Sequence, residues 1–524
     1  MKKTLYILLA AVTFSTVSCD MDRESPTSLP FDKAFENIGA IQSLERGAYS
    51  RLRTAMSPEA IIAPDIQADY VHAANGFSNT YGNIYRWTFT QEASEISSVW
   101  NNFYGAIGLY NFIIDGISYN LGFEAPEGSA ERNELNRIQG TAYLMRALSY
   151  TYLAERFCAD YDKSTAEAEY SGLPLAITYD SEKTPDRSTL KDVYDQIFKD
   201  IKEAKRLLVN VAGMQNATTM SIDCVTALEA RVLLQTDQHG EALKVAKTLI
   251  GNKTYSLVET QEDFNKMWSE DKSSETIFQF FASKTELAYQ WGYYFCSDFY
   301  NGADPRQCMF MPDFIPTRTC LDSYDGKDWR RQAYFFRCSA KEPVGNRWML
   351  PYVKGLSSVA EEMYLVYKFP GNPDLRTSSV WNYYNTFKVF RLAEAYLIAA
   401  EAAAVSGGDA ATPLNELRKH RGLDPLQSVS LEDVKKERYR EMMLEGTRIS
   451  DLKRWNSGFK RGEPQTSYVS ETGGNPWKEG SLIFEQNSDI SVEKDNYMLV
   501  WPIPASEVFA NPSMADQQNP GWRR

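Results

Sequence analysis

Helical periodicity of apolar residues is the feature that most constrains how this chain can fold. Between Val99 and Tyr119, aromatic and aliphatic residues recur every three or four positions, which places them on one face of a helix. The same spacing predicts a first helix at Ile41–Arg53 and a long helix at Glu131–Phe157. Further helices are expected at 189–208, 221–235, 239–251, 385–406, 411–420 and 431–444. The sequence therefore predicts a mostly α protein.

The predicted helices come in pairs joined by short turns. This organisation is similar to tetratricopeptide-type helical hairpins, although no clean sequence repeat is visible. A mature chain of about 500 residues exceeds the ~250–300 residues that a single core usually serves. Stacked helix pairs escape that limit because each pair contacts only its neighbours. No low-complexity linker divides the chain, so we expect one domain over residues 31–524.

Three long segments lack helical periodicity, at 61–97, 160–185 and 281–381. A short apolar run at 276–281 is the best candidate for a strand. Irregular loops longer than about 12–15 residues are usually functional or disordered. These segments are rich in Tyr, Trp and Phe, which favours order and makes them the natural place for a binding site. We therefore expect a helical scaffold with long loops and a few short strands.

The N-terminus predicts export. Lys2 and Lys3 precede an apolar run from Leu5 to Phe14, which is too short for a bilayer that needs roughly 20 apolar residues. A charged start followed by a brief apolar core is typical of a secretory signal peptide, here residues 1–18. The polar stretch at 19–30 is expected to be a flexible tether.

Cys19 follows the small residues that end the signal peptide, at the place where cleavage is expected. We interpret it as a lipidated first residue of the mature chain, and the alternative is an ordinary signal peptide with an incidental cysteine. Several acyl chains would anchor the protein stably, since each buried methylene contributes about 0.8 kcal/mol. Later segments are not apolar enough to cross a membrane.

Charge and composition exclude several functions. The formal net charge is -13 and no basic patch or Lys/Arg run is present, which disfavours nucleic-acid binding. Aromatic residues make up 13% of the chain, so it can bury a large core. Only 3 histidines occur, without an HExxH motif, a P-loop or a GxGxxG. We therefore predict no metal site, no cofactor and no catalytic residues.

A charge ladder occupies the predicted helix near residue 440. Arg438, Glu441, Glu445 and Arg448 are spaced three or four apart, so their side chains should align along it. Glu441 and Glu445 are one helical turn apart, but the flanking arginines favour a paired structural network over a catalytic pair. Carboxylate pairs for glycoside hydrolysis come from distant positions, so a surface glycosidase remains an alternative.

The segment 289–300, with the sequence YQWGYYFCSDFY, is the best ligand candidate. Rigid aromatic rings bind the apolar C–H faces of sugars at little entropic cost, and peptide side chains suit the same surface. The alternative is that the rings pack the loop onto the scaffold, and we expect two or three of them to be exposed. The candidate residues are Trp291, Tyr293, Tyr294, Asp298 and Tyr300.

A second ligand candidate is the segment 69–87, in which amide side chains alternate with aromatic ones. Asn75 offers a hydrogen-bonding amide, and Tyr81 and Trp87 offer ring faces. Residues of these types in an irregular segment are typical of a polar ligand site.

The 7 cysteines leave six after Cys19. An exported protein can form disulfides, but no CxxC or zinc-like spacing is present. Free buried thiols are an equal alternative to a bridge that staples the loops. Four cysteines lie in one irregular region, and their connectivity is open: Cys296, Cys308, Cys320 and Cys338.

Several motifs together resemble the SusD/RagB family of Bacteroidetes outer-membrane nutrient-binding lipoproteins. The resemblance is strongest in VKKERYREMMLEGTRISDLKRW at 434–455. It continues in FRLAEAYLIAAEA at 390–402, in NELRKHRGL at 415–423, and in the C-terminal WPIPASEVFANP and QNPGW. In the family these motifs mark the fold and do not contact the ligand. The resemblance covers most of the mature chain.

The resemblance implies a lipoprotein at the cell outer membrane that faces the exterior. The acidic residues after Cys19 resemble the surface-export signal of such lipoproteins, which agrees with this location. It implies capture of a nutrient, most often an oligosaccharide, for a SusC-like TonB-dependent barrel. A peptide-capturing RagB-like role is the second choice, and a structural assembly lipoprotein is a third. By location, the loop before Trp100 would line the pocket, while Asp328 and Arg330 would brace a variable loop.

Overall fold

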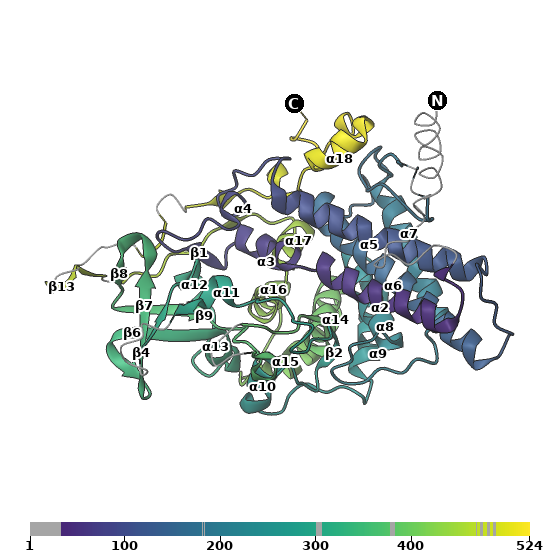
Figure 1. Cartoon of the computed structure of the whole chain (residues 1–524). Coiled ribbons are helices and arrows are strands. Elements are labelled where there is room, and N and C mark those ends of the chain that lie inside the picture. Colours follow the sequence, from purple (N-terminus) through teal and green to yellow (C-terminus); the bar gives the residue numbers. More distant parts are fainter. Residues whose placement is uncertain are drawn as a thin grey trace, which may run out of the picture.

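The computed structural model describes residues 33–180, 182, 184–299, 307–377, 383–467, 469–471, 475–478, 483–485 and 489–523. Figure 1 shows a body of packed helices with a lobe of strands at one end. The mostly α, tetratricopeptide-like architecture predicted above is confirmed. Cys19 and the tether lie outside the described residues, and no helix within them is both long and apolar enough to span a bilayer.

The predicted helices of the body are present in the predicted order. The helices of the body are α2 (Ile38–Ala55), α3 (Pro58–Gln67), α4 (Gly82–Tyr85), α5 (Ser94–Ser118), α6 (Ala130–Phe157), α7 (Leu190–Leu207), α8 (Ile222–Gln235), α9 (His239–Ile250), α10 (Gln261–Ser269), α14 (Leu392–Ser406), α15 (Ala411–Lys419), α16 (Leu431–Glu441) and α17 (Arg448–Arg454). Of these, α3, α4 and α10 were not predicted, and the first two lie largely in the segment 61–97 that was expected to be irregular. Short helices elsewhere are α11 (Tyr293–Cys296), α12 (Arg318–Asp322), α13 (Trp329–Tyr334) and α18 (Ala505–Ala510).

Helix α7 shows how local sequence sets an element. Thr189 and Asp192 form a reciprocal capping box that satisfies backbone donors at the helix start. Val193, Ile197 and Ile201 follow at helical spacing and are buried. The predicted start is therefore confirmed, because capping and amphipathicity agree.

Consecutive helices pack as neighbours, α6 with α7, α8 with α9, and α14 with α15, and α14 also packs against α9. Close approach requires small residues at the crossings. Gly140 on α6 faces α7, and a Cβ there would lie 2.8 Å from the Cβ of Leu207. One buried apolar cluster extends from Ala34 to Ile503, so the pairs and the lobe of strands share a core.

A six-stranded sheet occupies the region that the sequence predicted to be irregular, and this expectation was wrong. The sheet runs β3-β4-β7-β6-β9, with β8 paired to β7. Its hairpin turns at Gly345-Asn346, a two-residue signal that the sequence contained. The strands are β3 (Asp298–Phe299), β4 (Gln307–Phe310), β6 (Phe335–Val344), β7 (Arg347–Val353), β8 (Ser358–Val359) and β9 (Glu362–Val366).

Shorter strands tie loops to the body. The expected strand near residue 276 is β2 (Thr276–Gln279), and it pairs antiparallel with β10 (Lys388–Arg391). Helix α14 therefore starts at Leu392 and not at residue 385, because the preceding residues extend to reach β2. The remaining strands are β1 (Val71–Ala73), β5 (Phe314–Pro316), β11 (Phe459–Lys460), β12 (Val469–Glu471), β13 (Asn475–Lys478) and β14 (Ser491–Val492).

The charge ladder does not lie along one helix. Helix α16 ends at Glu441, because Leu444 and Gly446 adopt left-handed backbone angles of 58° and 81°. Glu445 and Arg448 therefore leave the predicted line. Arg448 pairs with Asp69 at 2.8 Å. These residues do form a network of ion pairs, but most of the partners come from other parts of the chain.

The centre of this network is a single buried carboxylate. Glu441 accepts from Arg330 at 3.0 Å, from Arg391 at 2.8 Å and from Arg421 at 2.9 Å. Burial alone would raise the pKa of Glu441, but the three guanidinium groups hold it well below its usual range. Asp328 pairs with Arg330 at 2.8 Å, which fits the bracing role that the resemblance implied. This cluster joins the lobe to the helices.

Candidate functional site

The two predicted ligand segments meet in space. The ring of Tyr81, from the segment 69–87, contacts the ring of Tyr294 edge-on at a centroid distance of 5.2 Å. Tyr293 lies next to Tyr294 at 5.7 Å. More than 200 positions of sequence separate the two segments, so the fold alone creates this meeting. We name the surface formed by residues 74–81, 293–294 and 313 the loop face.

Strand pairing positions the loop face. Strand β1 pairs antiparallel with β5, which aligns Ala73 with Phe314. Asp313 then bridges the two segments: its carbonyl accepts from the Ala74 N–H at 2.8 Å, and its own N–H donates to the Tyr294 carbonyl at 2.8 Å. Its carboxylate accepts from the Ser78 N–H at 2.7 Å and from the Ser78 hydroxyl. A single aspartate thus fixes both segments through backbone and side chain.

The loop that carries the face has an unusual backbone. Asn79, Tyr81 and Trp87 have positive φ angles of 67°, 56° and 58°. Non-glycine residues rarely adopt this region, and such strain persists only where the surroundings fix it. Gly76, at φ 75°, packs so tightly that a Cβ would lie 2.2 Å from the backbone nitrogen of Gly355. The loop is therefore held in one conformation.

The face offers rings and polar groups together. Tyr293 is 47% exposed, while Tyr294 is half-buried and Tyr81 is buried. Burial raises the pKa of both Tyr81 and Tyr294, so their hydroxyls stay protonated at neutral pH. Asn79 is exposed, and its side-chain oxygen accepts from the Arg86 guanidinium at 2.7 Å. An aromatic platform beside amides and hydroxyls suits a neutral polar ligand.

Several predicted residues lie elsewhere. Trp291 is only 2% exposed and packs on Phe387 at a ring distance of 5.1 Å, so its indole belongs to the core and offers no face to a ligand. Trp87 is half-buried, and its ring donates to the Gln67 carbonyl at 2.9 Å. The sequence gives no sign that Trp291 is more buried than Tyr293, because both lie in the same aromatic-rich segment.

Of the other predicted ligand residues, Asn75 lies at the loop face, and the positions of Asp298 and Tyr300 can be described only in part or not at all. Asn75 is half-buried at the edge of the loop face, where its backbone carbonyl accepts from the Gly355 N–H at 2.8 Å. Asp298 is described only as a backbone position in β3, which pairs with β4. Tyr300 lies outside the described residues. Among the four clustered cysteines, Cys320 and Cys338 carry free, buried thiols.

Sequence reasoning missed the roles of Asp313 and Gly355. Asp313 follows a proline in an apolar run, and Gly355 lies in a short turn, η2 (Lys354–Leu356), between strands that the sequence did not predict. A hairpin signal at Gly345-Asn346 would have placed that turn near a sheet edge. No local pattern would have placed it against Gly76.

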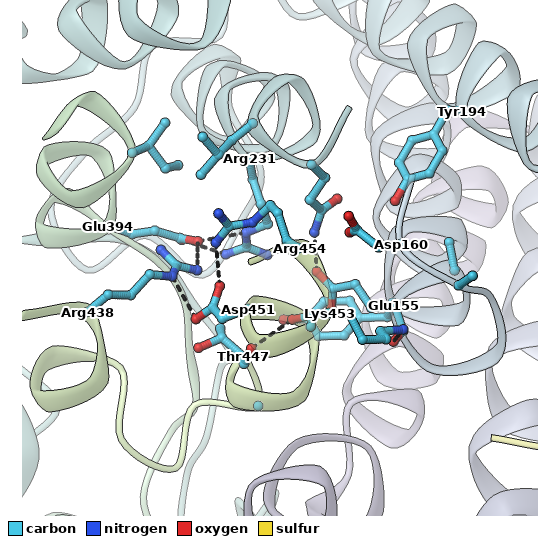
Figure 2. Close-up of a pocket in the computed structure, with 18 residues that line it drawn as sticks. Glu155, Asp160, Tyr194, Arg231, Glu394, Arg438, Thr447, Asp451, Lys453 and Arg454 are labelled. Atoms are coloured by element: carbon cyan, nitrogen blue, oxygen red, sulfur yellow. Dashed lines mark hydrogen bonds and ion pairs between the residues drawn. The ribbon is translucent and has the colours of Figure 1, made fainter. Parts of the chain in front are cut away.

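A small polar cavity lies between α6, α7, α8, α14, α16 and α17 (Figure 2). Figure 2 shows the labelled arginines beside the carboxylates of Glu394 and Asp451. Arg231 pairs with Glu394 at 2.7 Å, and Arg438 pairs with Asp451 at 2.7 Å. The cavity measures about 30 Å³, which is room for roughly two water molecules. It is too small for a nutrient, so we assign it to the structural charge network.

Family comparison agrees with the fold and the motifs. A model of the SusD family matches residues 236–522, which is more than half of the chain. The chain belongs to the SusD family. A second model, described as starch-binding associating with outer membrane, matches residues 21–234 of this SusD-family protein.

Individual relatives are distant. The starch-binding protein SusD of Bacteroides thetaiotaomicron is 36% identical over 136 residues, which is 26% of this chain and 21% of that protein. A crystal structure of a SusD superfamily protein from Bacteroides vulgatus superposes with a TM-score of 0.72 at 22% identity, over 93% of this chain and 100% of that one. Surface glycan-binding protein A of Bacteroides thetaiotaomicron gives a TM-score of 0.67 at 17% identity, over 93% and 99%. These structural matches establish the fold.

Proposed function

We propose that this protein is a cell-surface lipoprotein that binds an oligosaccharide at the loop face, without catalysing a reaction on it. The observation that carries the proposal is the convergence of two distant aromatic segments on one fixed surface, with Tyr293 exposed there. The family models and the named glycan-binding relatives support carbohydrate as the class of ligand. Rigid rings and a rigid loop reduce the entropic cost of binding.

The site is tested by calorimetric titration of the soluble chain beginning at Asp20. The probes are maltoheptaose, cellohexaose, mannohexaose, xylohexaose and a mixed-peptide digest. We expect at least one glycan to bind, and Tyr293→Ala to weaken its binding about tenfold because an exposed ring platform is lost. Tyr119→Ala is the matched control, since Tyr119 is 70% exposed and lies at the end of α5, away from the face.

Three outcomes would contradict the proposal. If peptides bind and glycans do not, the protein captures peptides. If a glycan binds equally well to the Tyr293→Ala variant, the loop face is not its site. If chromatography of the incubated glycans reveals shorter products, the protein is a glycosidase.

We also propose that the protein delivers its ligand to a SusC-like TonB-dependent barrel, to which it is bound at the outer membrane. This step follows from family membership and the predicted lipid anchor at Cys19. Affinity purification of the tagged protein from gently solubilised membranes is expected to recover such a barrel. Recovery of the protein alone, under conditions that keep other membrane complexes intact, would contradict this role.

A further inference from the structure

A second groove, separate from the loop face, lies beside the C-terminal segment of the chain. One wall is the loop 159–171, and the other is formed by residues 494–500 and 519–523. Its volume is about 620 Å³, within the range of about 300–1,000 Å³ that ligand sites occupy. The groove shares no lining residue with the loop face.

A buried arginine fixes the two walls to each other. Arg187 donates to the Gly172 carbonyl at 2.8 Å, at the end of the first wall. It also donates to the Asn519 side-chain oxygen at 2.8 Å, on the second wall, and to the Gln517 carbonyl at 2.5 Å, just before that wall. Asn519 in turn donates to the Phe157 carbonyl at 2.8 Å. The spacing of the walls is therefore set before any ligand arrives.

Tyrosine rings line both walls. Tyr497 is 46% exposed, and its ring is held by edge contact with Trp522 at 5.0 Å and by close packing on Gly521. A Cβ on Gly521 would lie 2.4 Å from the Tyr497 ring, so glycine is needed for this ring position. On the opposite wall, Tyr170 is half-buried and has a positive φ of 59°. The Tyr497 ring is thus a fixed platform in a groove that is open to solvent, and Tyr170 faces it from a loop with a constrained backbone.

The charges in the groove nearly cancel. Four carboxylate residues line it, together with three cationic ones, of which Lys453 donates to the Cys158 carbonyl at 2.8 Å and to the Glu155 carbonyl at 2.7 Å. These residues are Asp160, Asp162, Glu169, Asp495, Lys453, Lys494 and Arg523. A polyanion or polycation would find little net attraction here, whereas a neutral chain of hydroxyl groups would find acceptors and donors on every side.

The groove borders the small polar cavity of Figure 2. Ala159, Asp160 and Lys453 line both. The groove therefore adjoins the buried charge network. The exposed side chain of Asn456, at a positive φ of 47°, adds an amide at the rim.

We propose that this groove is a second carbohydrate site, which binds a neutral oligosaccharide between Tyr170 and Tyr497. The inference rests on the proposed function only for the class of ligand, since the site and its residues are separate. Two sites on one chain would let the protein hold a long glycan at two points, which raises its avidity without new contacts at either site.

The experiment uses the same four neutral oligosaccharides, the mixed-peptide digest and the soluble chain beginning at Asp20, now in the Tyr293→Ala background. Residual binding of at least one glycan is expected in that background. Adding Tyr497→Ala should weaken it about tenfold, because a ring platform is lost. Adding Ala168→Trp, which fills the groove from an exposed position, should do the same without removing a contact. Adding Tyr119→Ala should change nothing.

The outcomes separate this inference from the proposed function. If Tyr293→Ala alone abolishes all glycan binding, the groove is not a carbohydrate site, while the loop face stands. If residual binding survives both groove substitutions in folded protein, as checked by thermal melting, the inference is also overturned. If binding depends on the groove and not on Tyr293, the inference stands and the loop-face proposal fails. Binding of peptides and no glycan in the groove would contradict the inference.

Discussion

At the scale of single residues, Glu441 joins three buried arginines. It is fully buried and is shared by Arg330, Arg391 and Arg421. A buried ion cluster adds little net stability when it is complete, because desolvation offsets attraction. Removing one partner is costly, since it leaves buried charge uncompensated.

The first prediction follows from this arrangement. Glu441→Gln is expected to lower the free energy of unfolding by about 3–5 kcal/mol, because three buried guanidinium groups lose their shared carboxylate. Denaturant unfolding measures the change. Glu241→Gln is the matched control, because Glu241 pairs with Lys244 on an exposed helix face and its loss should matter little. Equal effects of the two substitutions would show that the cluster does not hold the lobe to the helices.

A second residue-scale prediction concerns pH. Burial lowers the pKa of His72 to about 4. The unfolded chain takes up this proton near pH 6.5, so between pH 6.5 and 4 the unfolded state binds more protons than the folded state. The stability that neutral His72 contributes is therefore complete above pH 6.5 and is lost as the pH falls toward 4.

The expected loss across that window is about 3 kcal/mol. Urea titrations between pH 7 and 4 on the parent protein and on His72→Gln measure it. The side-chain amide introduced by this substitution can still donate to the Gly462 carbonyl, which His72 contacts at 2.8 Å. The free energy of unfolding should fall less steeply with acidity in the variant. Parallel curves would mean that His72 is charged in the folded protein.

At the scale of elements, the loop face depends on two turns that meet backbone to backbone. Gly76 lies after β1 and Gly355 lies in the turn η2, and their closest approach leaves no room for a methyl group. A glycine is required at Gly76 both for its positive φ and for this contact.

Gly76→Ala is therefore expected to destabilise the fold by about 2 kcal/mol more than Gly128→Ala, and to weaken glycan binding at the loop face. Gly128 has a similar φ of 79°, but nothing lies within 4 Å of its Cβ position, so it reports the cost of the backbone angle alone. Thermal melting and calorimetric titration provide the two measurements. If the two variants melt together, the contact between the turns is not tight in solution.

At the scale of the whole molecule, the proposed function requires attachment to a membrane. No helix in the described part of the chain can provide it. We expect Cys19→Ser to move the protein from the membrane fraction to the soluble fraction of the cell, because acyl chains on Cys19 are the proposed anchor. Immunoblots of fractionated cells, with Cys158→Ser as the control, test this expectation. A variant that stays with the membrane would point to a different attachment.

Most of the helices were predictable from sequence, because periodicity is a local property. Helix α7 begins where Thr189 and Asp192 place it, and the apolar stripe behind it needs no knowledge of its partner. The motifs that resemble the SusD/RagB family predicted the fold for the same reason, since they encode packing and buried charge. The predicted helices and the predicted fold were both confirmed, because short-range pattern and global fold agree.

The six-stranded sheet, the end of α16 and the composition of the loop face were decided by tertiary structure. Trp291 and Tyr293 are two residues apart and of similar character, yet one is 2% exposed and the other 47% exposed. Arg448 lies off its predicted line because α16 ends before it, and its partner there is Asp69, which is distant in sequence. The sequence alone determined which segments carry aromatic binding chemistry. Only long-range packing decided which rings reach solvent, because burial depends on neighbours that no local pattern specifies.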